Sequence, residues 1–166
     1  MTEPVLSVLF VCTGNYCRSP TAEGMFLAML RAERLDGLVH VDSAGTHDYH
    51  VGEAPDPRTI AHAGRRGLDL RGLRGRQIEP GDFARFDLIL VMDRANWRDL
   101  DGVVPSDQRH KVRLMMDFAP HLGVDEVPDP YLGEAGDFER VLDLLDHALR
   151  GLLAHARARA AASTGD

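Results

Sequence analysis

The segment V-C-T-G-N-Y-C-R-S-P, residues 11–20, combines a nucleophilic side chain with groups that bind an anion. Cys12 follows an apolar run, and Arg18, six residues later, offers two parallel N–H groups to the oxygens of a tetrahedral anion. Gly14 allows the backbone to curl with its amides turned inward, and Asn15 tolerates the left-handed conformation that such a curl needs. The residue types and their order therefore predict a loop that holds a phosphate group above a sulfur nucleophile.

Three neighbours would stabilise the Cys12 side chain as an anion. Pro20 starts a helical pattern, and the N-terminal end of a helix attracts negative charge. Arg18 adds a full positive charge, and the Ser19 hydroxyl can donate a hydrogen bond to the sulfur. We therefore expect Cys12 to be a thiolate before any substrate binds. The alternative, a small buried side chain that merely ends a strand, leaves the composition of the loop unexplained.

The sequence V-P-D-P-Y-L-G, residues 127–133, offers an acid for the same reaction. Cleavage of a phosphoester requires a proton on the departing oxygen, and the Asp129 carboxyl group can supply it. Pro130 restricts Asp129 to extended backbone conformations, and Tyr131 can form one wall of a pocket for a flat ring. An isolated Asp-Pro pair usually marks a turn, so this interpretation depends on the cysteine loop.

Apolar runs of strand length alternate with helical patterns along the chain. The strand candidates are residues 5–11, 39–43, 86–92 and 112–116. The helix candidates begin at Ser19 as N-cap, at Pro57, at Asp93 as N-cap and near Asp137. This alternation predicts an α/β fold with a parallel sheet between helical layers, and it places Cys12 at the carboxyl end of the first strand, where ligands collect.

The length and composition suit one enzyme domain. We expect residues 1–156 of the 166 to form it and residues 157–166 to fray into solvent. The net charge of −7 argues against a nucleic acid partner, and no apolar run approaches the roughly 18 residues of a membrane span. The N-terminal residues do not match a secretion signal, and the two cysteines are too few for a disulfide scaffold. We therefore expect a cytoplasmic protein.

Five motifs occur in an order and spacing that resemble one enzyme family. They are C-T-G-N-Y-C-R-S-P at residues 12–20, D-S-A-G-T at 42–46, D-P-R at 56–58, M-D at 92–93 and D-P-Y at 129–131. Together they resemble the low-molecular-weight protein tyrosine phosphatases over nearly the whole chain. The resemblance implies a four-stranded parallel sheet flanked by helices on both faces, with the phosphate-binding loop after the first strand.

The resemblance also implies a mechanism. Phosphotyrosine would be hydrolysed through a cysteinyl-phosphate, with Cys12 as the nucleophile, Arg18 as the clamp on the transition state, and Asp129 as acid and then base. No metal or other cofactor is implied. Ser43, together with Asn15, would hold the loop in shape. The implied substrate-binding set is Thr13, Gly14, Asn15, Tyr16, Cys17, Ser19, Tyr49 and Tyr131.

Three residues raise questions that the resemblance does not answer. Tyr16 occupies a loop position that family members usually give to an aliphatic residue, so the pocket rim should be bulkier. Leu132 stands where many relatives have a second tyrosine, which argues against regulation through a phosphorylated tyrosine pair. Cys17 is either an inert packed thiol or the partner of Cys12 in a protective disulfide.

Other functions remain open on the same scaffold. Arsenate reductases relay electrons through further cysteines, but no cysteine follows Cys17. Protein arginine phosphatases carry a small polar residue at the position of Tyr16, and a binding module without turnover would normally lack Cys12 or Asp129. His47 and His50 lack the spacing of a zinc site, so we interpret them as residues of the pocket rim.

The expected partners are of two kinds: proteins that contain phosphotyrosine, as substrates, and oxyanions such as phosphate, as inhibitors. We expect the enzyme to be a monomer or a weak homodimer.

Overall fold

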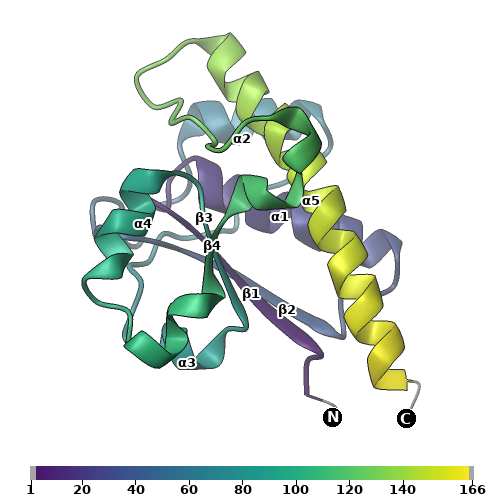
Figure 1. Cartoon of the computed structure of the whole chain (residues 1–166). Coiled ribbons are helices and arrows are strands. Elements are labelled where there is room, and N and C mark those ends of the chain that lie inside the picture. Colours follow the sequence, from purple (N-terminus) through teal and green to yellow (C-terminus); the bar gives the residue numbers. More distant parts are fainter. Residues whose placement is uncertain (1–2, 165–166) are drawn as a thin grey trace.

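The computed structural model describes residues 3–164, which contain a four-stranded parallel sheet in the order β2-β1-β3-β4 (Figure 1). The strands are β1 (Leu6–Cys12), β2 (Val39–Gly45), β3 (Leu88–Val91) and β4 (Val112–Leu114). β1 is central, because it pairs with β2 on one side and with β3 on the other. The predicted α/β fold with a four-stranded parallel sheet is confirmed.

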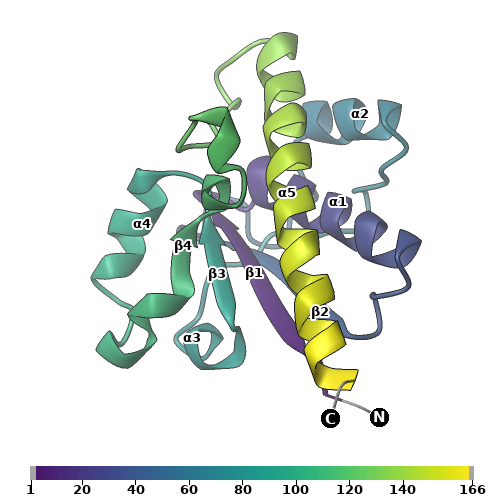
Figure 2. The ribbon, with the colours of Figure 1, turned by 45° about the vertical axis from the view of Figure 1, so that its right-hand side comes forward.

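Helices cover both faces of this sheet (Figure 2). The α-helices are α1 (Arg18–Ala32), α2 (Pro57–Arg65), α3 (Asp82–Arg85), α4 (Arg94–Asp101) and α5 (Ala135–Thr164). Three short 3₁₀ helices flank β4 in the chain. η1 (Ser106–Lys111) precedes the strand, and η2 (Met115–Phe118) and η3 (Pro120–Leu122) follow it. No helix among the described residues is long and apolar enough to cross a membrane.

Alternate side chains of β1 enter two separate cores. Leu6, Val8, Phe10 and Cys12 pack with α1 and α5 on one face, in contact with residues such as Phe26 and Leu145. Leu9 and Val11 pack on the other face with α3 and α4, against residues such as Phe83 and Leu100. Both faces of the strand are buried, which explains why its sequence is a continuous apolar run rather than an alternating one.

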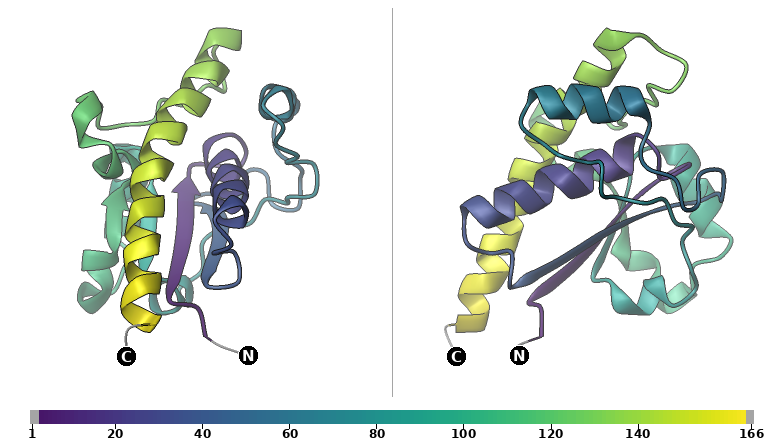
Figure 3. Two further views of the ribbon diagram at one scale, coloured as in Figure 1. Left: turned by 90° about the vertical axis from the view of Figure 1, so that its right-hand side faces the viewer. Right: turned by 180° about the vertical axis from the view of Figure 1, so that it is seen from behind.

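The C-terminal helix is longer than the sequence suggests. Fraying from residue 157 is wrong for the described part of the tail, because α5 continues to Thr164 with Ala160 buried. Arg157 pairs with Glu33, and the Arg159 guanidinium donates a hydrogen bond of 3.0 Å to the carbonyl oxygen of Val5. Residues 165–166 lie outside the described range. The two ends of the described part of the chain therefore lie near each other, at the end of the sheet remote from the loop after β1 (Figure 3).

Two helix starts test the predicted caps. Asp93 caps α4 as expected, and its carboxylate accepts the N–H of Asn96 at 2.8 Å. The prediction of Ser19 as the cap of α1 is wrong, because the helix already begins at Arg18 and the serine hydroxyl serves the preceding loop. The predicted strand at 112–116 stops at Leu114, where the chain turns into η2.

Candidate active site

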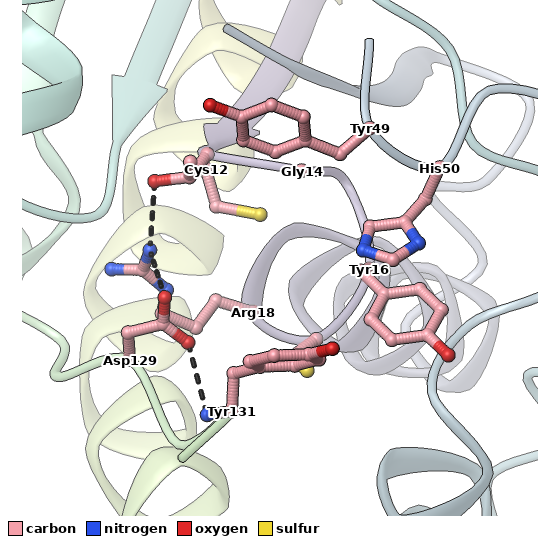
Figure 4. A pocket seen from close by; sticks show the side chains of 10 residues that line it. Cys12, Gly14, Tyr16, Arg18, Tyr49, His50, Asp129 and Tyr131 are labelled. Atoms are coloured by element: carbon pink, nitrogen blue, oxygen red, sulfur yellow. Dashed lines mark hydrogen bonds and ion pairs between the residues drawn. The ribbon is translucent and has the colours of Figure 1, made fainter. Parts of the chain in front are cut away.

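A cavity of about 370 Å³ opens at the carboxyl end of β1 (Figure 4). Three stretches of chain that are distant in sequence contribute to it: the loop before α1, the loop after β2 and the segment before α5. Its lining residues are Cys12, Thr13, Gly14, Tyr16, Cys17, Arg18, Tyr49, His50, Asp129 and Tyr131. The nucleophile, the arginine and the acid that the sequence suggested therefore share one cavity.

The loop after β1 owes its curved shape to Asn15 and to a close neighbour. Asn15 has a φ of +52°, the left-handed conformation expected from the sequence. Gly45 lies directly against the loop, and a Cβ there would lie 2.9 Å from the backbone oxygen of Thr13. The Cys12 and Thr13 carbonyl oxygens accept backbone N–H groups of the following segment, both at 2.9 Å. The glycine of the D-S-A-G-T motif thus provides room for the loop.

The amides of this loop are available to a ligand. No hydrogen bond among residues 3–164 uses the backbone N–H groups of residues 13–18 as donors. The loop ends at the start of α1, where the helix dipole adds partial positive charge. Buried or half-buried N–H groups without a protein acceptor are costly unless an anion or water accepts from them. Such a row of donors suits the oxygens of a tetrahedral anion.

A hydrogen-bonded chain of side chains supports the loop from beneath. The Cys12 Sγ atom lies 3.0 Å from the Ser19 Oγ atom. The Asn15 side-chain amide donates to the Ser19 hydroxyl at 2.7 Å and to the Ser43 hydroxyl at 3.0 Å. Ser43 in turn donates to a carboxylate oxygen of Glu23 at 2.6 Å. Asn15 and Ser19, expected in the substrate-binding set, therefore have side chains below the cavity rather than on its surface.

The chemistry of these groups determines the direction of each hydrogen bond. An ionised Glu23 carboxylate only accepts, so Ser43 must direct its proton toward Glu23 and accept from Asn15. Because Asn15 also donates to the Ser19 oxygen, the Ser19 proton can point to the Cys12 sulfur at 3.0 Å or to the Ala44 carbonyl oxygen at 3.4 Å. Burial raises the pKa of Glu23 more than the Ser43 hydrogen bond lowers it.

The Arg18 side chain is almost completely buried, with 2% of its surface exposed. Its guanidinium donates to the Asp93 carboxylate at 2.6 Å and to the Val127 carbonyl oxygen at 3.0 Å. Burial by itself would lower the pKa of Arg18, but the negative charges of Cys12, Asp93 and Asp129 outweigh it and the pKa is raised. The guanidinium is therefore permanently charged and fixed beside the sulfur.

Asp129 lies on the opposite side of the cavity from the loop (Figure 4). One carboxylate oxygen accepts the backbone N–H of Tyr131 at 3.1 Å, and the other lies 3.6 Å from the Arg18 guanidinium. Half of its side-chain surface is exposed to solvent. A carboxyl group in this position can exchange protons with water and also face a ligand bound over Cys12.

Aromatic rings form the rim of the cavity. The Tyr16 ring stacks on His50 with the centroids 3.6 Å apart and the planes 7° apart, and the Tyr16 and Tyr131 centroids are 6.1 Å apart. Tyr49 is 63% exposed and stacks on His47 at 4.9 Å. The rim therefore offers flat apolar surfaces that suit a phenyl ring.

Comparison with known proteins agrees with this geometry. The family profile described as "Low molecular weight phosphotyrosine protein phosphatase" matches residues 7–162. The low molecular weight protein-tyrosine-phosphatase of Streptomyces coelicolor is 42% identical over 153 residues, which cover 90% of this chain and 93% of that protein. The chain belongs to the low molecular weight phosphotyrosine protein phosphatase family.

Solved structures extend the comparison to the fold. A protein tyrosine phosphatase from Entamoeba histolytica, crystallised with Hepes in the active site, has a TM-score of 0.88 at 35% identity and covers 92% of this chain and 97% of its own. A drosophila arginine phosphatase has a TM-score of 0.82 at 30% identity, covering 89% of this chain and 96% of its own. Phosphatases with different named substrates are thus similar to this chain.

The second cysteine of the phosphatase loop differs in character from the first. Cys17 is buried, and desolvation raises the pKa of its thiol to about 12, an effect that a hydrogen bond from Thr59 only partly offsets. Cys12 and Cys17 are both free thiols. Because only a thiolate is strongly nucleophilic, the structure favours the packed, inert role for Cys17.

The sequence did not reveal several partners of the phosphatase loop. Asp93 was noted as a helix cap and as part of the M-D motif, but not as the partner of Arg18, which its second carboxylate oxygen binds. Glu23 was missed because it looks like any polar residue of an amphipathic helix. The Arg76 backbone N–H, which donates to the Asn15 side-chain oxygen at 3.0 Å, was missed because it comes from a segment without regular structure. No local signal in the sequence links these residues to the loop.

Proposed function

We propose that this protein hydrolyses phosphotyrosine in proteins by two displacements through a cysteinyl-phosphate on Cys12. One observation carries the proposal: the Cys12 thiol, the Arg18 guanidinium and the Asp129 carboxyl group line a single cavity with tyrosines at its rim. The first two bind and attack a phosphoryl group, and the third serves the departing oxygen. The family of the chain supports the same reaction.

In the first step the Cys12 thiolate attacks phosphorus in line with the tyrosyl oxygen. The S–P bond forms, the P–O bond breaks, and Asp129 gives its proton to the departing phenolic oxygen. The Arg18 guanidinium and the free amides of residues 13–18 hold the equatorial oxygens. These donors are fixed before reaction, so no free energy is needed to orient them as charge develops.

In the second step Asp129, now a carboxylate, takes a proton from a water molecule that attacks the phosphorus. The S–P bond breaks, phosphate leaves, and Cys12 returns to the thiolate. The Ser19 hydroxyl, 3.0 Å from the sulfur, stabilises this leaving thiolate. Asp129 thus acts first as acid and then as base, which its exposed position permits.

The experiment is a steady-state assay with para-nitrophenyl phosphate and a phosphotyrosine peptide. Wild-type protein should turn both over, and Cys12→Ser should abolish turnover while phosphate still binds. Rapid quenching during turnover of a ³²P-labelled phosphotyrosine peptide should trap phosphorus on Cys12 in the wild-type protein. Absence of turnover by the correctly folded wild-type protein would refute the proposal.

The arginine phosphatase alternative is tested at Tyr16. The stacked Tyr16 and His50 rings add an aromatic wall that favours a phenyl ring over a guanidinium chain. We expect wild-type protein to prefer phosphotyrosine peptides over phosphoarginine and phosphoserine peptides, and Tyr16→Thr to weaken that preference. A wild-type preference for phosphoarginine would make the alternative correct.

We also propose a cytoplasmic location, with phosphotyrosine proteins as substrates, inhibitory oxyanions such as phosphate as ligands, and a monomer or weak homodimer as the working form. The free thiol at Cys12 supports the location, because a catalytic cysteine needs a reducing compartment.

A further inference from the structure

A second cavity of about 670 Å³ adjoins the active-site cavity, and Asp129 lines both. One wall is the first half of α4, with Arg94 and Arg98, and another is the segment of residues 124–129. Arg140, in the first turns of α5, completes the lining. In Figure 2 the green segment that leads toward Asp129 lies between α4 and α5. We call this cavity the arginine groove.

Most of the carboxylates in the arginine groove already have partners. Asp93 is held by Arg18 at 2.6 Å, and Asp125 is held by the Arg94 guanidinium at 3.0 Å. Glu126 accepts the backbone N–H of Arg94 at 2.7 Å. The Arg94 guanidinium is therefore already paired with a carboxylate.

Two guanidinium groups of the groove remain free. The Arg98 and Arg140 side chains are exposed, and neither forms an ion pair or hydrogen bond within residues 3–164. The exposed carboxylates Asp48 and Glu53 lie in the loop after β2, beside the cavity residues Tyr49 and His50 in the chain. With Arg18, which pairs with Asp93, the groove has four guanidinium groups and four carboxylates, so it is close to neutral in a chain with a net charge of −7.

We propose that the arginine groove binds the carboxylates of acidic residues that neighbour phosphotyrosine in the substrate protein. Guanidinium groups bind carboxylates through paired N–H donors, and two such groups project into one cavity here. Because Asp129 borders both cavities, a polypeptide with its phosphotyrosine over Cys12 passes Asp129 to enter the groove. The inference deepens the proposed function and rests on it, since it names a class of substrate.

The test compares phosphotyrosine peptides that differ only in their flanking residues. One peptide has two glutamates before the phosphotyrosine, a second has them after it, and two matched peptides have glutamine instead. For the better-placed glutamate peptide, wild-type kcat/KM should exceed that of its glutamine match by about two- to fivefold at low salt, the range of an exposed ion pair. The preference should decline at high salt, because exposed charges are screened.

Variants assign the preference to the groove. Arg98→Ala and Arg140→Ala should each reduce the preference for glutamate, and the double variant should remove it. The matched control is Arg31→Ala, which removes an exposed and unpaired arginine of α1 that lines neither cavity. Turnover of para-nitrophenyl phosphate should be unchanged in all four variants, because that substrate has no flanking residues.

The outcomes separate this inference from the proposed function. If wild-type protein hydrolyses para-nitrophenyl phosphate but treats glutamate and glutamine peptides alike, the groove proposal is wrong and the phosphatase proposal stands. A preference that survives in the Arg98→Ala, Arg140→Ala double variant also overturns it. Failure to hydrolyse para-nitrophenyl phosphate would instead refute the proposed function.

Discussion

The loop that carries Cys12 and the segment that carries Asp129 are held in different ways. Beneath the loop, buried side chains form a continuous hydrogen-bonded chain to Glu23, and the Arg18 side chain is 2% exposed. The Asp129 side chain is 50% exposed and is held by one backbone N–H and by an ion pair of 3.6 Å. In the proposed mechanism, the groups that bind charge are thus fixed beforehand, whereas the group that would transfer protons stays in contact with water.

The difference has a physical reason. Donors that stabilise a transition state lose their value if they must reorient, so a rigid support beneath the loop favours catalysis. An acid that works in both directions must lose and regain a proton in every cycle, and solvent contact allows this. Variants on the two sides of the cavity should therefore fail in different ways.

The largest effect is expected at the buried side. Arg18→Lys should lower kcat/KM for para-nitrophenyl phosphate by about a hundredfold or more, because an ammonium group cannot provide paired donors to Asp93 and to the phosphoryl oxygens. The loss should be the same for good and poor leaving groups. Arg31→Lys, an exposed change in the same helix, is the control. Full activity of Arg18→Lys would show that the paired donors are not needed.

At the exposed side, the loss should depend on the leaving group. Asp129→Asn should slow phenyl phosphate by about a hundredfold and para-nitrophenyl phosphate much less, because nitrophenolate leaves without a proton. The free energy of unfolding should change by no more than about 0.5 kcal/mol, as expected for an exposed side chain. Asp107→Asn, in the exposed η1 helix, is the control. Equal losses with both substrates would contradict the role of Asp129 as the acid.

A variant at Arg58 tests whether the segment that carries Asp129 is held in place by a side chain. Its guanidinium holds the Asp56 carboxylate at 2.8 Å and the Tyr131 carbonyl oxygen at 2.9 Å, and so fastens the start of α2 to the segment after Asp129. Arg58→Ala should slow phenyl phosphate by about tenfold through a misplaced acid. In the Asp129→Asn background the same change should have little further effect. Additive losses in this double-mutant cycle would mean that Arg58 acts elsewhere.

The smallest effect on rate is expected at Glu23, the remote end of the buried chain. Glu23→Gln should slow turnover by about threefold. An amide can donate as well as accept, so the hydrogen bond between Ser43 and residue 23 could then run in either direction. The measurements are the turnover of a phosphotyrosine peptide and the rate of Cys12 alkylation, and both should decrease. A rate unchanged within error, with unchanged alkylation, would show that the chain does not depend on the carboxylate.

The free energy of unfolding of Glu23→Gln should increase relative to wild type, although its turnover should fall. Burial raises the pKa of Glu23, so the folded protein binds the Glu23 proton more tightly than the unfolded chain does. The resulting stability is fully present below the usual pKa of glutamate and is lost as the pH rises through the raised pKa. The neutral amide avoids that loss. Urea unfolding should therefore show that the stability of Glu23→Gln increases relative to wild type from pH 4 to pH 7.5. A difference in stability that does not change with pH would contradict the raised pKa of Glu23.

Local sequence predicted the candidate reacting groups better than the side chains that support them. Cys12, Arg18 and Asp129 lie in motifs whose neighbours limit the backbone, such as Gly14 and Pro130, so their chemistry was visible in short segments. Glu23 and Asp93 are polar residues of ordinary helical segments, and nothing beside them in the chain indicates a partner. The predicted fray from residue 157 was wrong because Arg157 pairs with Glu33, Arg159 binds the Val5 carbonyl oxygen, and Ala160 is buried.

The sequence by itself indicated the proposed chemistry and determined the fold class, because a candidate nucleophile, a candidate anion-binding loop and the alternation of apolar runs are all encoded over short distances. Only the tertiary structure decided how these parts cooperate. Parallel strands bring the ends of distant segments to one edge of the sheet, so Arg18 meets Asp93, Asn15 meets Ser43, and Asp129 borders two cavities. Hydrogen bonds between such segments depend on position in space, which no spacing along the chain records.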